Sequence, residues 1–408
     1  MNLTEAYLLL AVMLAVVAVV SVLFKGKSGL IAPLIFVAGL ITALVAGLGF
    51  RLREVTEGPF VFVDTLMWVL CGAAFSYLLY VNGTFQFLFA KVVGKKRSPA
   101  AQMFILILFI GLPGMITGTA LASVATTGLM AGRYLLDKGM EKSKVVEVVT
   151  VGALMGMLLP PLCVPAMAPT IARQGLYPGA FEGYFLPILI LALPALIVYC
   201  ALAGRRVLGE WEADGNVEKT GSAVCLIPLA VVAVLVLCYN FLYFLIPYYG
   251  GYPVIYLIGF VLALILAYAS VVETFNLVGV NGTLSAQMEI AGINGAVIAL
   301  VLGLLVLAGG LLLGTPFAYV VGALATYLVS NSNYGSYELS MMAVGAAIAM
   351  SMFLALRGSL AETVGETLGV TGVTGTEVVK RNIIFTLVLT AAIVVFLVAG
   401  SSLKFLMI

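Results

Sequence analysis

The stretch FIGLPGMITGTALASVATTGLMAGRYLLDKG (residues 109–139) contains a break in the middle of an apolar run. An apolar segment leads into the break, the small residues Thr117–Thr119 interrupt it, and a second apolar segment continues until charges appear at Arg133 and Asp137. Each arm has about 16 to 18 residues, slightly fewer than the ~20 that cross ~30 Å of hydrocarbon as a helix. The break therefore needs an explanation other than a surface loop.

The composition of the chain is that of a membrane protein. Of the 408 residues, 63% are hydrophobic and 9% are charged, whereas roughly a quarter of the residues of a soluble domain are charged. Apolar stretches of membrane-spanning length recur along the whole chain, and nothing of soluble-domain size lies between them. The absence of histidine excludes histidine proton relays, histidine-ligated haem and most zinc sites. We therefore expect an all-α polytopic membrane protein.

Basic residues gather in loops that we expect on the cytoplasmic side, because cytoplasmic loops carry an excess of Lys and Arg. These loops are Lys25–Lys27, Lys91–Arg97, Arg133–Lys144, Arg205–Lys219 and Arg357–Arg381. Three other loops contain neither Lys nor Arg and are expected outside: Tyr248–Tyr252, Asn276–Gln287 and Asn331–Tyr337.

Both ends of segment 100–136 lie beside basic loops, so we interpret this segment as a re-entrant helical hairpin with its tip inside the membrane. At such a tip the second arm presents free N–H groups and the first arm presents free carbonyl oxygens. Small Gly and Thr residues allow a substrate anion or Na⁺ to approach that backbone. The alternative is a Gly/Thr packing contact between two ordinary spans.

A second break is predicted within the apolar segment 145–169. Pro160 and Pro161 lie in its middle, where proline cannot donate a backbone hydrogen bond and its ring crowds the preceding turn. The helix should unwind there, beside the hairpin tip. A simple proline kink is the alternative.

Two short matches indicate an internal duplication. The tetrapeptide VNGT occurs at 81–84 and at 280–283, and the Gly-Thr pair 118–119 is echoed at 314–315. The second match predicts another hairpin at 293–329, and its flanks lack basic residues, so it should enter from outside. Four clear spans lie between the two hairpins, whereas an inverted arrangement needs an odd number of spans. The charge asymmetry of the loops nevertheless favours inverted repeats.

This organisation divides the chain into four parts. They are an N-terminal transmembrane helix (1–27), a first repeat with its hairpin and broken helix (28–203), a cytoplasmic linker (204–222) and a second repeat (223–408).

The segment Phe75–Ala168 resembles the large membrane subunit of tripartite ATP-independent periplasmic (TRAP) transporters. Its hairpin tip is Thr117–Ala120, followed by a glycine step at Gly128, a Lys-Gly loop at Lys138–Met140 and a proline break at Gly156–Leu162. The close resemblance covers about a quarter of the chain, and the remainder agrees in layout only.

The resemblance implies an elevator-type secondary transporter of the ion transporter superfamily, and no enzyme. Its expected substrate is a small organic anion such as a carboxylate, taken up with Na⁺. The substrate residues it implies are Thr117, Gly118, Thr119, Pro161, Gly314 and Thr315. The implied Na⁺ ligands are Thr117, Gly118, Thr119, Gly156 and Pro160.

The same resemblance implies the setting in which the chain works. We expect it in the inner (cytoplasmic) membrane of a prokaryote, surrounded by lipid bilayer. It acts there either with a periplasmic binding protein and a small membrane subunit, or as a homodimer. No feature indicates binding to nucleic acid.

A cation/proton antiporter or H⁺-coupled carrier of the same superfamily remains the alternative function. It requires an essential membrane carboxylate. Asp64, Glu147 and Glu273 lie near predicted span ends, which favours solvated side chains, and Asp64 is the best candidate of the three. In the second half, 345–356 lacks a proline pair, and 362–382 is interpreted as a cytoplasmic linker.

Overall fold

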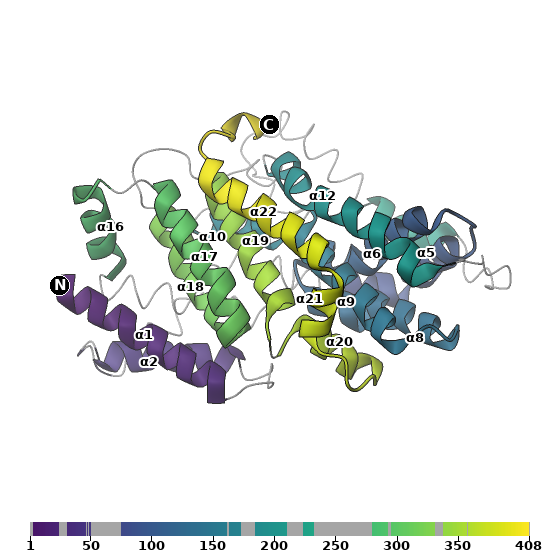
Figure 1. The fold of residues 1–408 in the computed structure, drawn as a ribbon, viewed down its shortest axis with the longest axis horizontal. Helices are drawn as coiled ribbons and strands as arrows, with labels where there is room; N and C mark the ends of the chain where they lie inside the picture. The colour runs from purple at the N-terminus through teal and green to yellow at the C-terminus, as the bar shows by residue number, and fades with distance from the viewer. Residues whose placement is uncertain are drawn as a thin grey trace.

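The computed structural model is a bundle of helices, as expected, and the part of the chain that it describes contains no strand (Figure 1). The described residues are 3–23, 31–45, 47, 49, 75–160, 163–172, 184–209, 223–231, 280–292, 295–330, 338–356 and 358–407.

The described elements fall into two groups along the sequence. The first group is α1 (Leu3–Leu23), α2 (Ile31–Val45), α5 (Thr84–Val93), α6 (Pro99–Thr117), α7 (Ala120–Ser123), the π-helix η3 (Val124–Gly128), α8 (Leu129–Asp137), α9 (Lys142–Leu158), α10 (Val164–Ala172), α12 (Phe185–Ala203), the π-helix η4 (Gly204–Leu208) and the 3₁₀-helix η5 (Ala223–Leu226). The second group is α16 (Val280–Ile290), α17 (Gly295–Leu313), α18 (Thr315–Ser330), α19 (Glu338–Leu354), α20 (Leu360–Leu368), α21 (Gly375–Arg381), α22 (Ile383–Ala399) and the 3₁₀-helix η6 (Lys404–Leu406).

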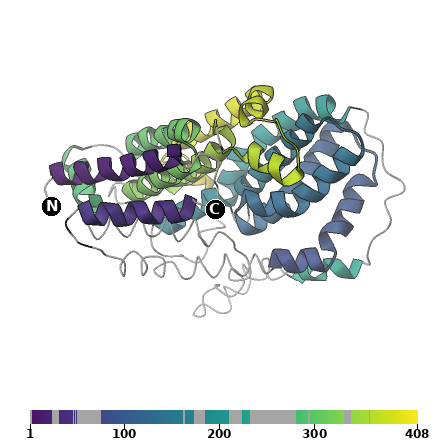
Figure 2. The ribbon, with the colours of Figure 1, turned by 90° about the horizontal axis from the view of Figure 1, so that it is seen from below.

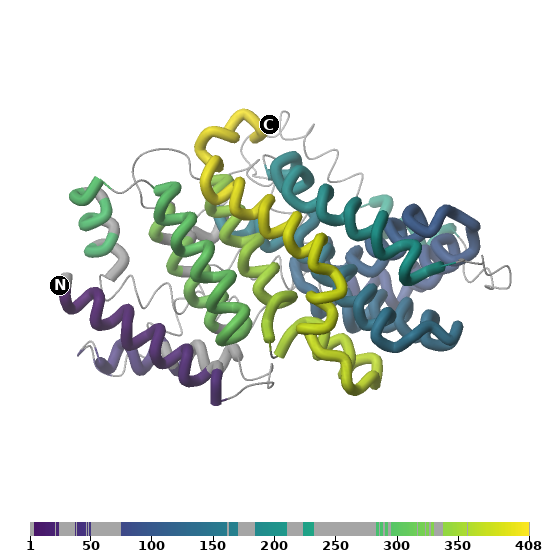
Figure 3. Tube along the Cα trace, viewed as in Figure 1, coloured from purple at the N-terminus to yellow at the C-terminus, as the bar shows by residue number. Residues whose placement is uncertain are grey.

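Three of the described helices are long and apolar enough to cross a membrane: Pro99–Thr117, Phe185–Leu208 and Gly295–Leu313. A fourth span results if α21 and α22 are counted together, although the chain bends by 88° between them. Figure 3 shows this elbow at the end of α22 that lies far from the C-terminus. These lengths and compositions agree with an integral membrane protein.

Helices of the two groups match in length and spacing. α6 and α17 each have 19 residues, and they begin at Pro99 and Gly295, 196 positions apart. α9 and α19 each have 17 residues and begin at Lys142 and Glu338, again 196 apart. α10 and α20 each have 9 residues and start with the same spacing.

The two groups pack against each other in a reciprocal way. α10, from the first group, lies on α18 and α19, whereas α20, from the second group, lies on α8 and α9. A Cβ at Gly345 would lie 2.7 Å from the carbonyl oxygen of Val164, so α10 and α19 touch through backbone. α12 and α22 contact each other, and α1 contacts α2, α16 and α18. Figure 2 shows the first-group helices α6–α9 at one end and α1 with α2 at the other.

The segment expected to be a linker, 362–382, is mostly helical instead. Ser359 caps the start of α20 by accepting a hydrogen bond from the Glu362 N–H (3.3 Å). Thr374 and Glu377 form a reciprocal capping box at the start of α21. Ser359, Thr374 and Glu377 are thus helix-cap residues, because their side chains satisfy free N–H groups at a helix start.

Another boundary also differs from the prediction. The helix predicted to end before 204 continues as η4 through Leu208, so the interhelical linker starts later than expected. Its last turn is of the wide π type, which changes the direction in which the side chains of Arg205 and Arg206 leave the helix.

Candidate functional site

The predicted break at 117–119 is present in the structure. α6 ends at Thr117, Gly118 adopts a left-handed conformation with φ of 70°, and α7 begins at Ala120. Gly118 permits this turn because a residue without Cβ reaches positive φ at little cost. The Gly118 N–H donates to the Gly114 carbonyl (2.6 Å), which closes the last turn of α6.

Both threonine hydroxyls at the tip are buried and take part in local hydrogen bonds. Thr117 Oγ1 donates to the Pro113 carbonyl (2.7 Å) and accepts from the Thr119 N–H (3.3 Å). Thr119 is the N-cap of α7, where its Oγ1 accepts from the Ala122 N–H (3.1 Å). A hydroxyl oxygen has two lone pairs. Each oxygen therefore keeps one lone pair that could coordinate a cation.

The two arms on either side of the tip are joined by hydrogen bonds. Ser123 Oγ accepts from the Gly114 N–H (2.9 Å) and approaches the Gly111 carbonyl (3.4 Å). One turn further from the tip, Thr127 Oγ1 donates to the Ile110 carbonyl (2.8 Å). The arms are antiparallel, because residues later in the second arm meet residues earlier in the first. The sequence analysis did not single out Ser123 and Thr127. Their four-residue spacing places both hydroxyls on one helix face, opposite Gly111 and Gly114, and this pattern could have predicted hydrogen bonds between the arms.

Gly156 lies where α9 crosses the hairpin. A Cβ at Gly156 would lie 2.6 Å from the Gly111 carbonyl oxygen and 2.9 Å from Ser123 Oγ. A Cβ at Gly111 would lie 3.0 Å from the Gly152 carbonyl oxygen, and a Cβ at Gly114 would lie 3.0 Å from Gly156 Cα. α6 and α9 are therefore parallel and in backbone contact, which only small residues allow.

The predicted unwinding of segment 145–169 is also present, since α9 ends at Leu158 and α10 starts at Val164. Leu159 is extended, and Pro160 is buried in the break. Because Pro160 has no N–H, the Gly156 carbonyl lacks the donor that a continuous helix would supply. Pro161 lies outside the described residues.

The first tip and this break lie at the same level. α6 and α9 run in parallel through Gly114 and Gly156, so one further turn of each brings the tip beside Pro160. The last carbonyls of α6, the Gly156 carbonyl and the tip hydroxyls thus surround one region. Among the described residues no group of three His, Cys, Asp or Glu could hold a metal. A cation here would therefore be bound by backbone and hydroxyl oxygens.

The second predicted tip has a similar backbone. Gly314 has φ of 93° between α17 and α18, and its N–H donates to the Gly310 carbonyl (3.0 Å). Thr315 follows and is buried. A Cβ at Gly310 would lie 2.3 Å from Ser351 Cβ, so α17 touches α19 just before the tip.

A second helix break, which the sequence did not predict because it lacks a proline pair, follows α19. α19 ends at Leu354 and α20 starts at Leu360, and the Leu356 N–H donates to the Leu311 carbonyl (3.2 Å). The residue 196 positions before Leu356 is Pro160, which cannot make this bond. The two breaks thus differ in backbone chemistry.

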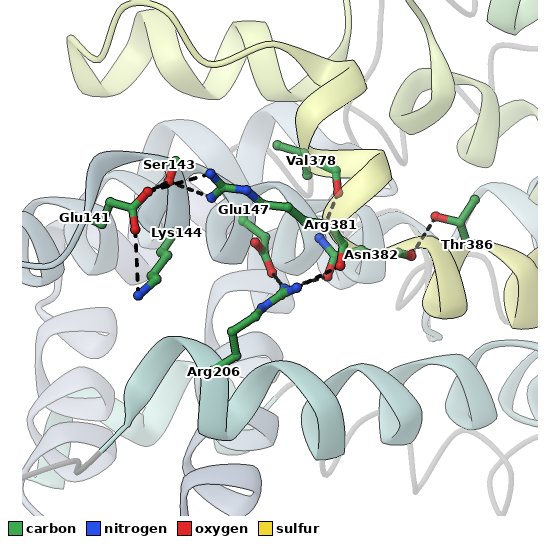
Figure 4. Close-up of polar contacts among 9 residues, drawn as sticks. All are labelled: Glu141, Ser143, Lys144, Glu147, Arg206, Val378, Arg381, Asn382 and Thr386. Carbon is green, nitrogen blue, oxygen red and sulfur yellow. Dashed lines mark hydrogen bonds and ion pairs between the residues drawn. The ribbon is translucent and has the colours of Figure 1, made fainter.

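Of the three candidate acids, only Glu147 lies within the described residues, and it is not solvated as expected. Its side chain is fully buried on α9 and forms an ion pair with Arg206 of η4 (Figure 4). Glu147 lies close to a helix end in sequence, but α6 and α12 pack on α9 and Arg206 of η4 pairs with its carboxylate, so the side chain is covered. Asp64 and Glu273 fall outside the described residues.

Comparison with known proteins gave no relative: no family model matches the chain, and no curated protein sequence matches it.

Proposed function

We propose that this chain is a secondary active transporter that takes up a small organic anion with Na⁺ by an elevator mechanism, as the resemblance to the TRAP large subunit implies. The proposed transport unit comprises two inverted repeats, each with a helical hairpin and a broken helix. The observation that carries the proposal is the paired arrangement of tips and breaks along the chain.

A spacing of 196 positions that several elements share supports the duplication. Shifting the first tip by 196 positions superimposes Gly118 and Thr119 on Gly314 and Thr315. The same shift takes the break after Leu158 to the break after Leu354. A chance match of a Gly-Thr dipeptide would not explain why three pairs of flanking helices have equal lengths. Duplication of a whole unit explains it.

Reciprocal packing supports a two-fold relation between the repeats. When two copies of a unit are related by a two-fold axis, element A of one copy touches B of the other, and the reverse contact also occurs. The contacts of α10 with α19 and of α20 with α9 follow this rule, as does the contact of α12 with its counterpart α22. Together with the one-sided distribution of basic loops, this favours an axis in the membrane plane.

The chemistry of the tips supports a cation and an anion as ligands. At each tip the last carbonyls of one helix and the first N–H groups of the next lack partners within their own helix, and those that the local hydrogen bonds leave free are open to a ligand. The carbonyls and the Thr117 and Thr119 hydroxyls suit Na⁺, while the N–H groups and the positive helix end suit a carboxylate. A bound Na⁺ would also offset the charge of the anion.

The proposal extends to the surroundings of the chain. We place it in the inner membrane of a prokaryote, either with a periplasmic binding protein and a small membrane subunit or as a homodimer. Neighbouring genes distinguish these arrangements, because only the first requires genes for the two partner proteins.

The decisive experiment measures thermal stabilisation of the purified protein in NaCl and KCl at equal ionic strength, with and without a panel of small carboxylates. We expect a Na⁺-specific rise in Tm that deepens with one carboxylate, since a ligand that binds only the folded state stabilises it. Thr119→Ala should abolish the rise, and Thr119→Ser, which keeps the hydroxyl, should retain it.

Thr126→Ala is the matched control. Its hydroxyl donates to the Ala122 carbonyl within the second arm and lies away from the tip. It should lower Tm slightly and leave the Na⁺ response intact. No cation preference in the wild type would exclude the Na⁺ site and favour the proton-driven carrier built around Asp64.

A further inference from the structure

A cluster of Glu147, Arg206 and Asn382, here called the clasp, joins three separate parts of the chain (Figure 4). Arg206 extends from η4, and its guanidinium pairs with the buried carboxylate of Glu147 on α9. The same guanidinium donates to the Asn382 side-chain oxygen (3.1 Å) and to the Arg381 carbonyl (2.7 Å). One arginine thus connects α9, the end of α12 and the elbow between α21 and α22.

The elbow is built to present these acceptors. Asn382 lies at the bend, its side-chain amide donates to the Val378 carbonyl (2.9 Å), and its carbonyl accepts from Thr386 Oγ1 (2.9 Å). These bonds fix the side-chain oxygen of Asn382 toward Arg206. The π-type turn of η4 directs Arg206 to the same point from the other side.

Burial makes the two ends of the ion pair unequal. The Glu147 side chain is 0% exposed, whereas the Arg206 side chain is 41% exposed. If α9 moved away from η4, Arg206 could be hydrated where it stands, but Glu147 would remain a buried charge without its partner. Such a charge is strongly unfavourable, so separation requires water to reach Glu147.

The clasp has no equivalent in the second repeat. The positions 196 residues after Glu147 and Arg206 are Ala343 and Ser402. There α19 and α22 meet through small groups instead, with Ser340 Oγ close to the carbonyl of Leu397 (3.3 Å). A packing requirement common to both repeats does not explain a charged contact in only one of them.

We propose that the clasp is a latch that holds the first hairpin and broken helix against α12 and α22 on the side of the basic loops. Opening of the latch exposes the α9 face that carries Glu147 to water on that side. The inference rests on the proposed elevator function, and it assigns α12 and α22 to the part of the protein against which α9 moves.

The test measures access to α9 with a single cysteine at Thr150, which is buried one turn after Glu147. The five native cysteines are replaced by alanine, and a membrane-impermeant maleimide is applied to inside-out vesicles without Na⁺ or carboxylate. We expect Glu147→Gln to raise the labelling rate at least about tenfold, because it removes the charge pair that closes the latch. Glu141→Gln is the matched control, since Glu141 is an exposed carboxylate near the start of α9 that pairs with Arg381 instead.

Labelling of Glu147→Gln at the parental rate would overturn the latch, and so would equal acceleration by Glu141→Gln. If Glu147→Gln is not monodisperse, Asn382→Ala, which removes a single neutral acceptor from Arg206, decides in the same way. Because the assay contains no Na⁺ or carboxylate, its outcome is separate from that of the thermal-shift experiment. A Na⁺-specific rise in Tm without faster labelling would support the proposed function and overturn the latch. Faster labelling without a Na⁺-specific rise in Tm would do the reverse.

Discussion

At the scale of single residues, the hairpin depends on a few hydroxyls and glycines. Ser123 and Thr127 connect the arms below the tip, and Gly111, Gly114 and Gly156 let α9 approach the same surface. Each of these residues is small, and their importance comes from the backbone groups that they contact.

Thr127→Ala should destabilise the protein by roughly 1 kcal/mol, because it leaves the Ile110 carbonyl without its cross-arm donor in a buried place. The adjacent Thr126→Ala removes a hydroxyl of the same kind that bonds only within its own arm. Thermal unfolding in detergent should therefore show a larger loss of Tm for Thr127→Ala. Equal losses would mean that the cross-arm bond contributes nothing beyond a helical back-bond.

Gly156→Ala tests the helix crossing. The added methyl would lie 2.6 Å from the Gly111 carbonyl oxygen, which is backbone and cannot rotate away. We expect a loss of roughly 1–3 kcal/mol from overpacking, measured by thermal unfolding, together with a weaker Na⁺ response if the break moves. An unchanged Tm would show that α6 and α9 can separate at this point without cost.

At the scale of helices, capping decides where several elements begin. α20 and α21 occupy a stretch rich in Gly, Thr and acidic residues, and each starts at a hydroxyl cap. α20 then packs on α8 and α9, with Leu368 over Gly132. A helix of this length is marginal by itself, so tertiary packing completes what the caps begin.

Thr374→Ala should weaken α21 by about 1 kcal/mol, because it removes the hydroxyl that accepts from the Glu377 N–H, which is one half of the capping box. Faster amide hydrogen exchange within 375–381, compared with the wild type, is the measurement. Thr367→Ala serves as the control, since its exposed hydroxyl donates only to the Thr363 carbonyl. Exchange that rises equally in both variants would contradict the role of the cap.

The features that were predictable from sequence are those with a strong local cause. Gly118 between two apolar arms and Pro160 in a proline pair both favour a helix break, and both breaks are present, although the single prolines Pro113 and Pro194 lie inside helices. The break after Leu354 has no proline pair, and it contains Gly358 at a φ of 62° and the N-cap Ser359, while the Leu356 N–H bonds to α17. The Glu147–Arg206 pair was equally invisible, since its partners are far apart in sequence and only the packed helices bring them together.

At the scale of the whole molecule, the spacing of 196 positions gives a sharp test of inversion. Lys95 and Ala291 are separated by this spacing, and both are exposed in the structure. Single cysteines at the two positions, in a background without native cysteines, should label from opposite sides of the membrane with an impermeant reagent. Labelling from the same side would exclude inverted repeats while leaving a duplication in place.

The reciprocal contacts of α10 and α20 have a consequence for synthesis of the chain in the cell. The first hairpin and α9 are complete once residue 158 has been made, but one side of α9 stays uncovered until α20, starting at Leu360, arrives to pack on it. The two halves thus mature together rather than in turn. A pause in synthesis between them would leave α9 without the helix that packs on it, and such an intermediate is the form that quality-control proteases would meet.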